Sequence, residues 1–114
     1  MSHTTILEVQ IGDKGLPVLL PAFGPDGARL DVSLASGISL TFVGPDGVAL
    51  MVAGEIFPLG DGTGLGYVPQ DGDGVFELAG PWLIEAAFSL PDGYSGATEI
   101  ETAMVLHNIQ AYAP

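Results

Sequence analysis

The carboxylates of this chain have the types and spacing that could most readily carry chemistry. Asp61, Asp71 and Asp73 stand in glycine-rich segments, and a flexible loop of this kind can offer several oxygens to a hard cation such as calcium. The full EF-hand spacing with its terminal glutamate is absent, and Asp-Gly pairs are also typical of tight turns. We therefore interpret these aspartates as turn residues and keep calcium binding as the alternative.

Glu99 and Glu101 form a second candidate site, because two carboxylates on one face of a strand could perform acid–base hydrolysis. No aromatic-rich groove for a sugar is evident in the sequence. His3 and His107 are the only histidines, and neither belongs to a Ser-His-Asp spacing that suggests a catalytic triad. The sequence therefore predicts no enzymatic activity, no cofactor and no metal site, with hydrolysis at the two glutamates as a minor alternative.

Several aromatic residues could line a ligand site or a protein contact. Trp82 starts an apolar strand, which favours a place in the core, and we interpret Tyr67 in the same way. Tyr94 follows a turn and Tyr112 lies near the end of the sequence, so both are candidates for surface contact. A carbohydrate- or receptor-binding module would use Tyr94 together with the aspartate loops.

The charge balance is strongly acidic. Asp and Glu total 14, Lys14 and Arg29 are the only Lys and Arg residues, and the net charge is −12. Binding to nucleic acid or to an anionic membrane requires a basic patch, so we expect neither partner. Charged residues make up 14% of the chain, against roughly 25% in soluble domains, while hydrophobic residues reach 47%. We expect part of this apolar surface to be buried against other chains.

The chain must be held together by packing, because it contains no cysteine. Its 114 residues fit one domain, which we place over residues 1–114. The first residues lack the pattern of a secretory signal, and no apolar run reaches the roughly 18 residues of a membrane span. We expect a soluble product that is synthesised in the cytoplasm.

Glycine and proline recur too often for a long helix, with 17 Gly and 9 Pro. Asp-Gly pairs mark the turns, and three of them are preceded by Pro25, Pro45 and Pro91. The short apolar stretches between the turns predict an all-β fold, an immunoglobulin-like antiparallel β-sandwich of about seven strands. The predicted strands are Thr5–Ile11, Pro17–Phe23, Gly37–Val43, Val48–Val52, Gly64–Val68, Pro81–Leu90 and Glu99–Ile109.

Alternation assigns faces to some of these strands. In the segment 81–90 one face is apolar and is predicted to be core, with Trp82, Ile84, Ala86, Phe88 and Leu90. The opposite face carries Leu83, Glu85, Ala87 and Ser89. The segments Leu16–Phe23 and Ala103–Leu106 carry no charge, and only Pro17 and Pro21 discourage edge pairing. We expect either strand addition at such an edge or a flat subunit interface.

The order of these elements resembles the immunoglobulin-like domains of phage tail and baseplate proteins, especially the baseplate upper protein family. The resemblance covers most of the chain and is clearest between Gly64 and Gly93. The residues that carry it are Ile11-Gly12-Asp13, Leu16-Pro17, Pro25-Asp26-Gly27, Leu30-Asp31-Val32-Ser33, Leu40-Thr41-Phe42, Gly64-Leu65-Gly66-Tyr67, Asp71-Gly72-Asp73, Ala79-Gly80-Pro81-Trp82, Glu85-Ala86-Ala87-Phe88 and Pro91-Asp92-Gly93.

The resemblance implies a non-enzymatic structural subunit of a bacteriophage particle, placed in the tail, neck, baseplate or capsid surface. Its expected partners are other virion proteins and copies of itself, in a homo-oligomer of a symmetric assembly. The expected location is the virion. The alternative is a carbohydrate- or receptor-binding β-sandwich module, with calcium assistance at the Asp61, Asp71 and Asp73 loops.

Overall fold

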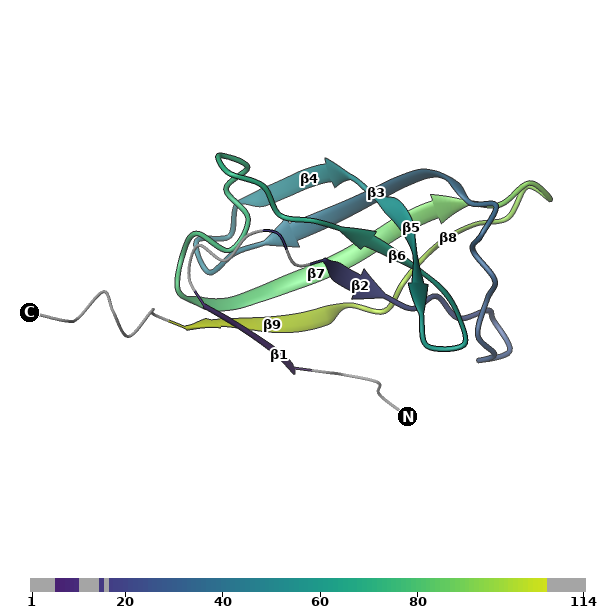
Figure 1. Cartoon of the computed structure of the whole chain (residues 1–114), viewed down its shortest axis with the longest axis horizontal. Helices are drawn as coiled ribbons and strands as arrows, with labels where there is room; N and C mark the ends of the chain where they lie inside the picture. The colour runs from purple at the N-terminus through teal and green to yellow at the C-terminus, as the bar shows by residue number, and fades with distance from the viewer. Residues whose placement is uncertain (1–5, 11–14, 16, 107–114) are drawn as a thin grey trace, which may run out of the picture.

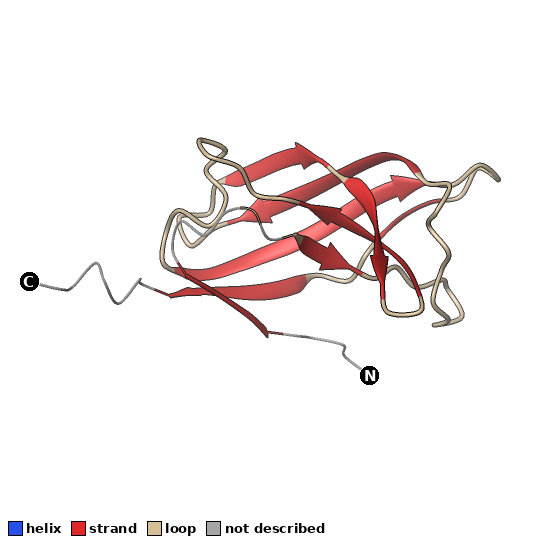
Figure 2. Cartoon of the chain, viewed as in Figure 1, coloured by secondary structure: helices blue, strands red, loops and turns tan. Residues whose placement is uncertain are grey.

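The computed structural model describes residues 6–10, 15 and 17–106, and this part of the chain is all-β (Figures 1 and 2). It contains no helix, and therefore no helix that could span a membrane. The strands in the described part are β1 (Ile6–Gln10), β2 (Val18–Leu20), β3 (Ser36–Val43), β4 (Ala49–Ala53), β5 (Glu55–Leu59), β6 (Gly62–Tyr67), β7 (Gly80–Ser89), β8 (Ser95–Ala97) and β9 (Glu101–Leu106).

The strands form two sheets that pack face to face as a β-sandwich (Figure 1). The larger sheet has six strands in the order β1-β9-β7-β3-β4, with β8 also paired to β7. The smaller sheet has three strands in the order β2-β6-β5. All neighbours are antiparallel except β1 and β9, which run parallel from the Ile6–Thr102 pair to the Gln10–Leu106 pair. The predicted antiparallel β-sandwich is confirmed for all the pairs among β2 to β9, and the parallel pairing of β1 with β9 is an addition to it.

Seven of the strands correspond to predicted ones, and β5 and β8 are additional. The sequence hides β5 because Pro58 lies within it and only Gly54 separates it from β4. Gly54 fits this tight bend because a side chain there would lie 2.5 Å from Leu40 Cδ1. The sequence hides β8 because its three residues, Ser-Gly-Ala, show no apolar alternation.

The three Pro-Asp-Gly segments form turns, as predicted. Gly27, Gly47 and Gly93 each have a positive φ of 79–94° and donate an N–H to the carbonyl three residues earlier. The aspartates add side-chain bonds: Asp26, Asp46 and Asp92 each accept the N–H of the residue two positions later. These turns set the register of the strands on either side.

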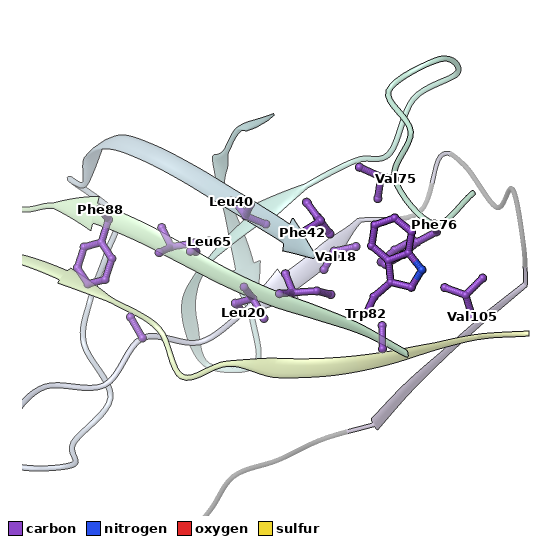
Figure 3. Close-up of a cluster of buried hydrophobic side chains, with 14 of the residues drawn as sticks. Val18, Leu20, Leu40, Phe42, Leu65, Val75, Phe76, Trp82, Phe88 and Val105 are labelled. Atoms are coloured by element: carbon purple, nitrogen blue, oxygen red, sulfur yellow. The ribbon is translucent and has the colours of Figure 1, made fainter. Parts of the chain in front are cut away.

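The core lies between the two sheets (Figure 3). Trp82, Ile84, Ala86 and Phe88 are buried there, which confirms the predicted inner face of β7, and Leu90 packs against them only partly buried. Phe76 packs edge to face against both Phe42 and Trp82, with ring centroids 5.6 Å apart in each pair. This fully buried ring sits on a backbone with a left-handed φ of 59°, so its packing offsets the local strain.

Candidate functional site

Asp73 organises the loop that follows β6. Its Oδ2 accepts hydrogen bonds from the Tyr67 hydroxyl at 2.5 Å and the Gln70 N–H at 2.8 Å, and its Oδ1 accepts the Val75 N–H at 2.9 Å. Burial, followed by the hydrogen bond and charge of Asp73, raises the pKa of Tyr67 to about 12. The Asp73 carboxylate is therefore engaged by donors of its own loop and of β6, as expected of a turn residue.

The structure does not bring the three loop aspartates together. Asp61 lies in the turn between β5 and β6, whereas Asp71 and Asp73 follow the other end of β6 (Figure 1). A strand of this length separates its two ends by roughly 20 Å. Among the residues that the structure describes, no group of three or more His, Asp or Glu side chains could hold a metal ion. A calcium site shared by the three aspartates is therefore not formed.

The two glutamates do not form the expected pair on one strand face. Glu101 is the first residue of β9, whereas Glu99 precedes the strand and is exposed. The predicted strand Glu99–Ile109 is wrong at its start, because the connection from β8 extends to Ile100. Glu101 is instead paired in register with the core residue Ile84, and it lines a groove along β2.

This groove is an apolar depression of about 530 Å³ between β2 and β9. Its lining combines apolar residues of both sheets with Arg29 and Glu101. None of the lining residues is a serine, cysteine or histidine, so the usual nucleophile–base pairs are missing from the groove. The residues that line it are Pro17, Val18, Leu19, Leu20, Pro21, Phe23, Arg29, Leu59, Gly60, Ile84, Glu101 and Thr102.

Arg29 ties the segment between β2 and β3 to the β5–β6 hairpin. Its guanidinium donates hydrogen bonds to the carbonyl oxygens of Leu59 at 2.9 Å and Thr63 at 3.0 Å. The Thr63 hydroxyl donates to Asp31 and accepts the N–H of Val32. Hydrogen bonds from Ser33 and Thr63 hold the pKa of Asp31 below its usual value. Sequence reasoning missed these structural roles, because each depends on a contact some thirty positions away along the chain.

The aromatic candidates divide between core and surface. Trp82 belongs to the core, as predicted, and its Nε1–H donates to the Leu78 carbonyl at 2.9 Å. Tyr67 packs its ring against Phe42, with centroids 5.9 Å apart. Tyr94 is 36% exposed and leans on Phe88, with centroids 6.2 Å apart. The remaining candidates lie outside the described residues: His3, His107, Tyr112 and Lys14.

The larger sheet has an apolar outward side, and no packing among the described residues explains it. We call it the outer face and define it as the outward-pointing residues of β3, β4, β7 and β9. Its apolar side chains include Met51, Leu83 and Leu106, which are 72%, 45% and 38% exposed. Among the described outward-pointing residues of these four strands, Glu85 is the only charged one. The full set is Ser39, Thr41, Val43, Ala49, Met51, Ala53, Pro81, Leu83, Glu85, Ala87, Thr102, Met104 and Leu106.

The strand register makes the outer face continuous. One row runs across four strands, through Ala49, Val43, Leu83 and Thr102. The next row places Met51 beside Thr41 and Thr41 beside Glu85. Side chains directly opposite in neighbouring strands lie about 5 Å apart, so these rows form one surface rather than isolated positions.

The outer side of the smaller sheet is built differently. Gly62, Gly64 and Gly66 of β6 point outward, and the side chains of Leu19, Phe57 and Leu59 lie over Gly64 and Gly66. A side chain on Gly66 would come within 2.6 Å of Phe57 Cδ2 and 2.7 Å of Leu19 Cδ2. Leu19, Phe57 and Leu59 are therefore only partly exposed, because they cover the glycines.

The free edge of β2 is poorly suited to strand addition. The carbonyls of Val18 and Leu20 lie beside Gly66 and Gly64 of β6. The N–H and C=O of Leu19, which lies between them, therefore point away from β6 toward the free edge. Pro17 and Pro21 flank this strand and have no N–H to offer an incoming strand. These observations disfavour strand addition at the β2 edge.

The alternation in β7 identified Leu83 and Glu85 of the outer face in advance. Met51 was missed, because its place beside these residues depends on how β3 pairs with both β4 and β7. Comparison of the chain with protein families, with curated proteins and with solved structures finds no match. The geometry and chemistry of the outer face are therefore the basis for a functional proposal.

Proposed function

We propose that this chain is a non-enzymatic structural subunit of a bacteriophage particle that acts through protein–protein interfaces. The observation that carries the proposal is the outer face, where exposed Met51, Leu83 and Leu106 share one surface with a single charge. Exposed apolar patches of this kind mark protein contacts in soluble proteins. The chain has a net charge of −12, so a surface with one charge contrasts with its overall composition.

The strand order supports an immunoglobulin-like sandwich as the fold of this subunit. In that fold, strands B, E and D form one sheet, while G, F, C and C′ form the other. The orders β2-β6-β5 and β9-β7-β3-β4 match this arrangement if β2 is strand B and β9 is strand G. The resemblance to phage tail and baseplate domains rests on the turn and strand residues between Gly64 and Gly93, and it supplies the particle as the setting.

The proposed location is the virion, in the tail, neck, baseplate or capsid surface. Several copies would dock there on other virion proteins, arranged by the symmetry of the particle. The proposal of a calcium-assisted carbohydrate- or receptor-binding module has weaker support. Its three aspartates lie at opposite ends of β6, and Asp73 already accepts three hydrogen bonds.

The test is quantitative peptide mass spectrometry on purified phage particles from the source of this sequence. We expect this chain to be present in a fixed copy number per particle, in the hundreds for a capsid or tail-tube position and far fewer for a neck or baseplate position. A particle preparation that lacks the chain would overturn the proposal. Host proteins of similar abundance in the same lysate serve as the control for carry-over.

A further inference from the structure

Glu85 lies within the outer face, in the same row as Thr41 and Met51. It lies on β7, between Leu83 and Ala87 along the strand, and Thr41 of β3 is its direct neighbour across the sheet. Met51 of β4 follows beyond Thr41. Glu85 is exposed, and among the described residues its carboxylate takes part in no hydrogen bond or ion pair. Any protein that covers the apolar side chains of this face also covers this carboxylate.

A carboxylate that is removed from water without a compensating charge destabilises a complex strongly. A partner that covers the outer face must therefore bring a cation to Glu85. A lysine or arginine surrounded by apolar side chains meets this need, because the apolar surroundings match Met51 and Leu83 while the cation compensates the carboxylate.

A second copy of this chain does not fit the same requirement. Two outer faces placed against each other would bury both Glu85 carboxylates in one interface, and the outer face as defined contains no lysine or arginine to compensate them. Among the residues that the structure describes, Arg29 is the only lysine or arginine, and it lies away from the outer face and donates to the carbonyls of Leu59 and Thr63. Like charges in one interface disfavour that association, here the pairing of two copies through their outer faces.

We propose that Glu85 selects the partner of the outer face: a different protein with a flat apolar surface and a lysine or arginine opposite Glu85. The same carboxylate keeps copies of this chain from pairing through their outer faces. This inference rests on the proposed function for the use of the face, and it adds the chemistry of the partner. Copies in a particle would then be held side by side by that partner rather than face to face.

The chain itself provides a defined probe for this idea. The substitution Glu85→Lys turns the outer face into an apolar surface that carries a cation in place of the carboxylate. We expect a mixture of the natural chain and the Glu85→Lys variant to form a 1:1 heterodimer, so that the weight-average mass approaches twice 11.7 kDa in sedimentation experiments at about 1 mM chain. Each protein alone should remain monomeric, and added salt should weaken the heterodimer.

The matched control is Glu55→Lys, which makes the same charge change at an exposed position of β5 on the smaller sheet. Its mixture with the natural chain should remain monomeric. The proposal is overturned if the Glu85→Lys mixture remains monomeric, or if the Glu55→Lys mixture associates equally well. It is also overturned if the natural chain alone dimerises through the outer face.

Circular dichroism and denaturation curves must first show that each variant is folded, and Glu85→Arg replaces Glu85→Lys if the latter is not. Failure of this mixing experiment is distinguishable from failure of the proposed function. The mixing experiment reports on the chemistry of the outer face alone, whereas the particle analysis reports on the presence of the chain in virions. Either result can occur without the other.

Discussion

The smaller sheet turns Leu19, Phe57 and Leu59 outward, and the larger sheet turns Met51, Leu83 and Leu106 outward. Both sets are apolar, yet those of the smaller sheet lie partly buried over glycines, whereas Met51 stands 72% exposed. Composition alone cannot separate the two surfaces. The residues beneath the side chains separate them. On the smaller sheet, glycines leave space into which neighbouring side chains fold, whereas the larger side chains of β3 and β7 leave no such space on the larger sheet.

The largest expected effect on stability comes from adding a side chain to one of the outward-pointing glycines of β6. In Gly66→Ala the added methyl would lie 2.8 Å from the Val18 carbonyl oxygen and against the side chains of Leu19 and Phe57. Because the carbonyl belongs to the backbone, β2 must shift, and we expect a loss of about 3 kcal/mol in the free energy of unfolding. Urea denaturation measures this loss.

Ala87→Val is the control for Gly66→Ala, because it enlarges an exposed side chain of the outer face. It should change stability by less than about 0.5 kcal/mol. Equal losses of unfolding free energy in the two variants would contradict the distinction between the smaller sheet, whose side chains cover its glycines, and the exposed outer face of the larger sheet.

The second largest effect on stability is expected in the loop after β6, which Asp73 holds together by hydrogen bonds. Asp73→Ala removes the acceptor of three hydrogen bonds, and we expect a loss of about 2 kcal/mol in unfolding free energy. Asp71→Ala, in the same loop and exposed, is the matched variant and should be nearly neutral. A loss of similar size in both would assign the effect to the loop rather than to the hydrogen bonds.

The bond between Tyr67 and Asp73 also predicts a dependence on pH. Because the folded-state pKa of Tyr67 is raised from 10.0 to about 12, its contribution to stability is fully present below pH 10. The contribution is lost as the pH rises from 10 through about 12, since the unfolded chain releases the phenolic proton more readily. Denaturation midpoints measured across this range should fall less steeply in Tyr67→Phe.

A smaller loss is expected when the cover over the glycines is shortened. Leu19→Ala removes apolar contacts from a partly buried position, which should cost about 1 kcal/mol. The comparison residue is Leu83, since Leu83→Ala truncates the same side chain on the outer face. If Leu83→Ala proves as destabilising as Leu19→Ala, then Leu83 contributes to the fold more than its exposure indicates.

Removing the exposed apolar side chains of the outer face should have the smallest effect on stability and the largest effect on heterodimer formation. In the double variant Met51→Ser and Leu83→Ser, stability should change by only about 0.5 kcal/mol, because both side chains are exposed. The heterodimer with Glu85→Lys should nevertheless be lost, since the apolar area around the charge pair is gone. Sedimentation of the mixture measures the second effect, and retention of the heterodimer would separate the charge contact from the apolar face.

Local sequence signals predicted those parts of the fold that depend on neighbouring residues. Pro-Asp-Gly fixed the turns, and the alternation from Trp82 to Phe88 identified the inner and outer sides of β7. Signals of this kind failed at β5, because Pro58 argues against a strand and nothing in the sequence indicates that Pro58 stands on an edge strand. The parallel pairing of β1 with β9 joins residues from the two ends of the chain, which no local pattern encodes.

The candidate site was predictable to a similar extent. Alternation placed Leu83 and Glu85 on a common outer side, but their joining with Met51 required the register of three strands. The aspartates that first suggested chemistry are spaced closely along the chain, but β6 lies between them and carries Asp61 far from Asp73. The two glutamates do not share a strand face, because β9 begins at Glu101 and Glu99 precedes it.

The parallel pairing of β1 and β9 has a mechanical consequence. The chain enters this pair at Ile6, beside Thr102, and leaves it at Leu106, beside Gln10. Tension applied through the two ends of the chain therefore pulls the two strands past each other along their length. The evenly spaced hydrogen bonds of a parallel pair then bear the load together instead of opening one after another. A pull of this kind would load the β1–β9 ladder in shear along its length.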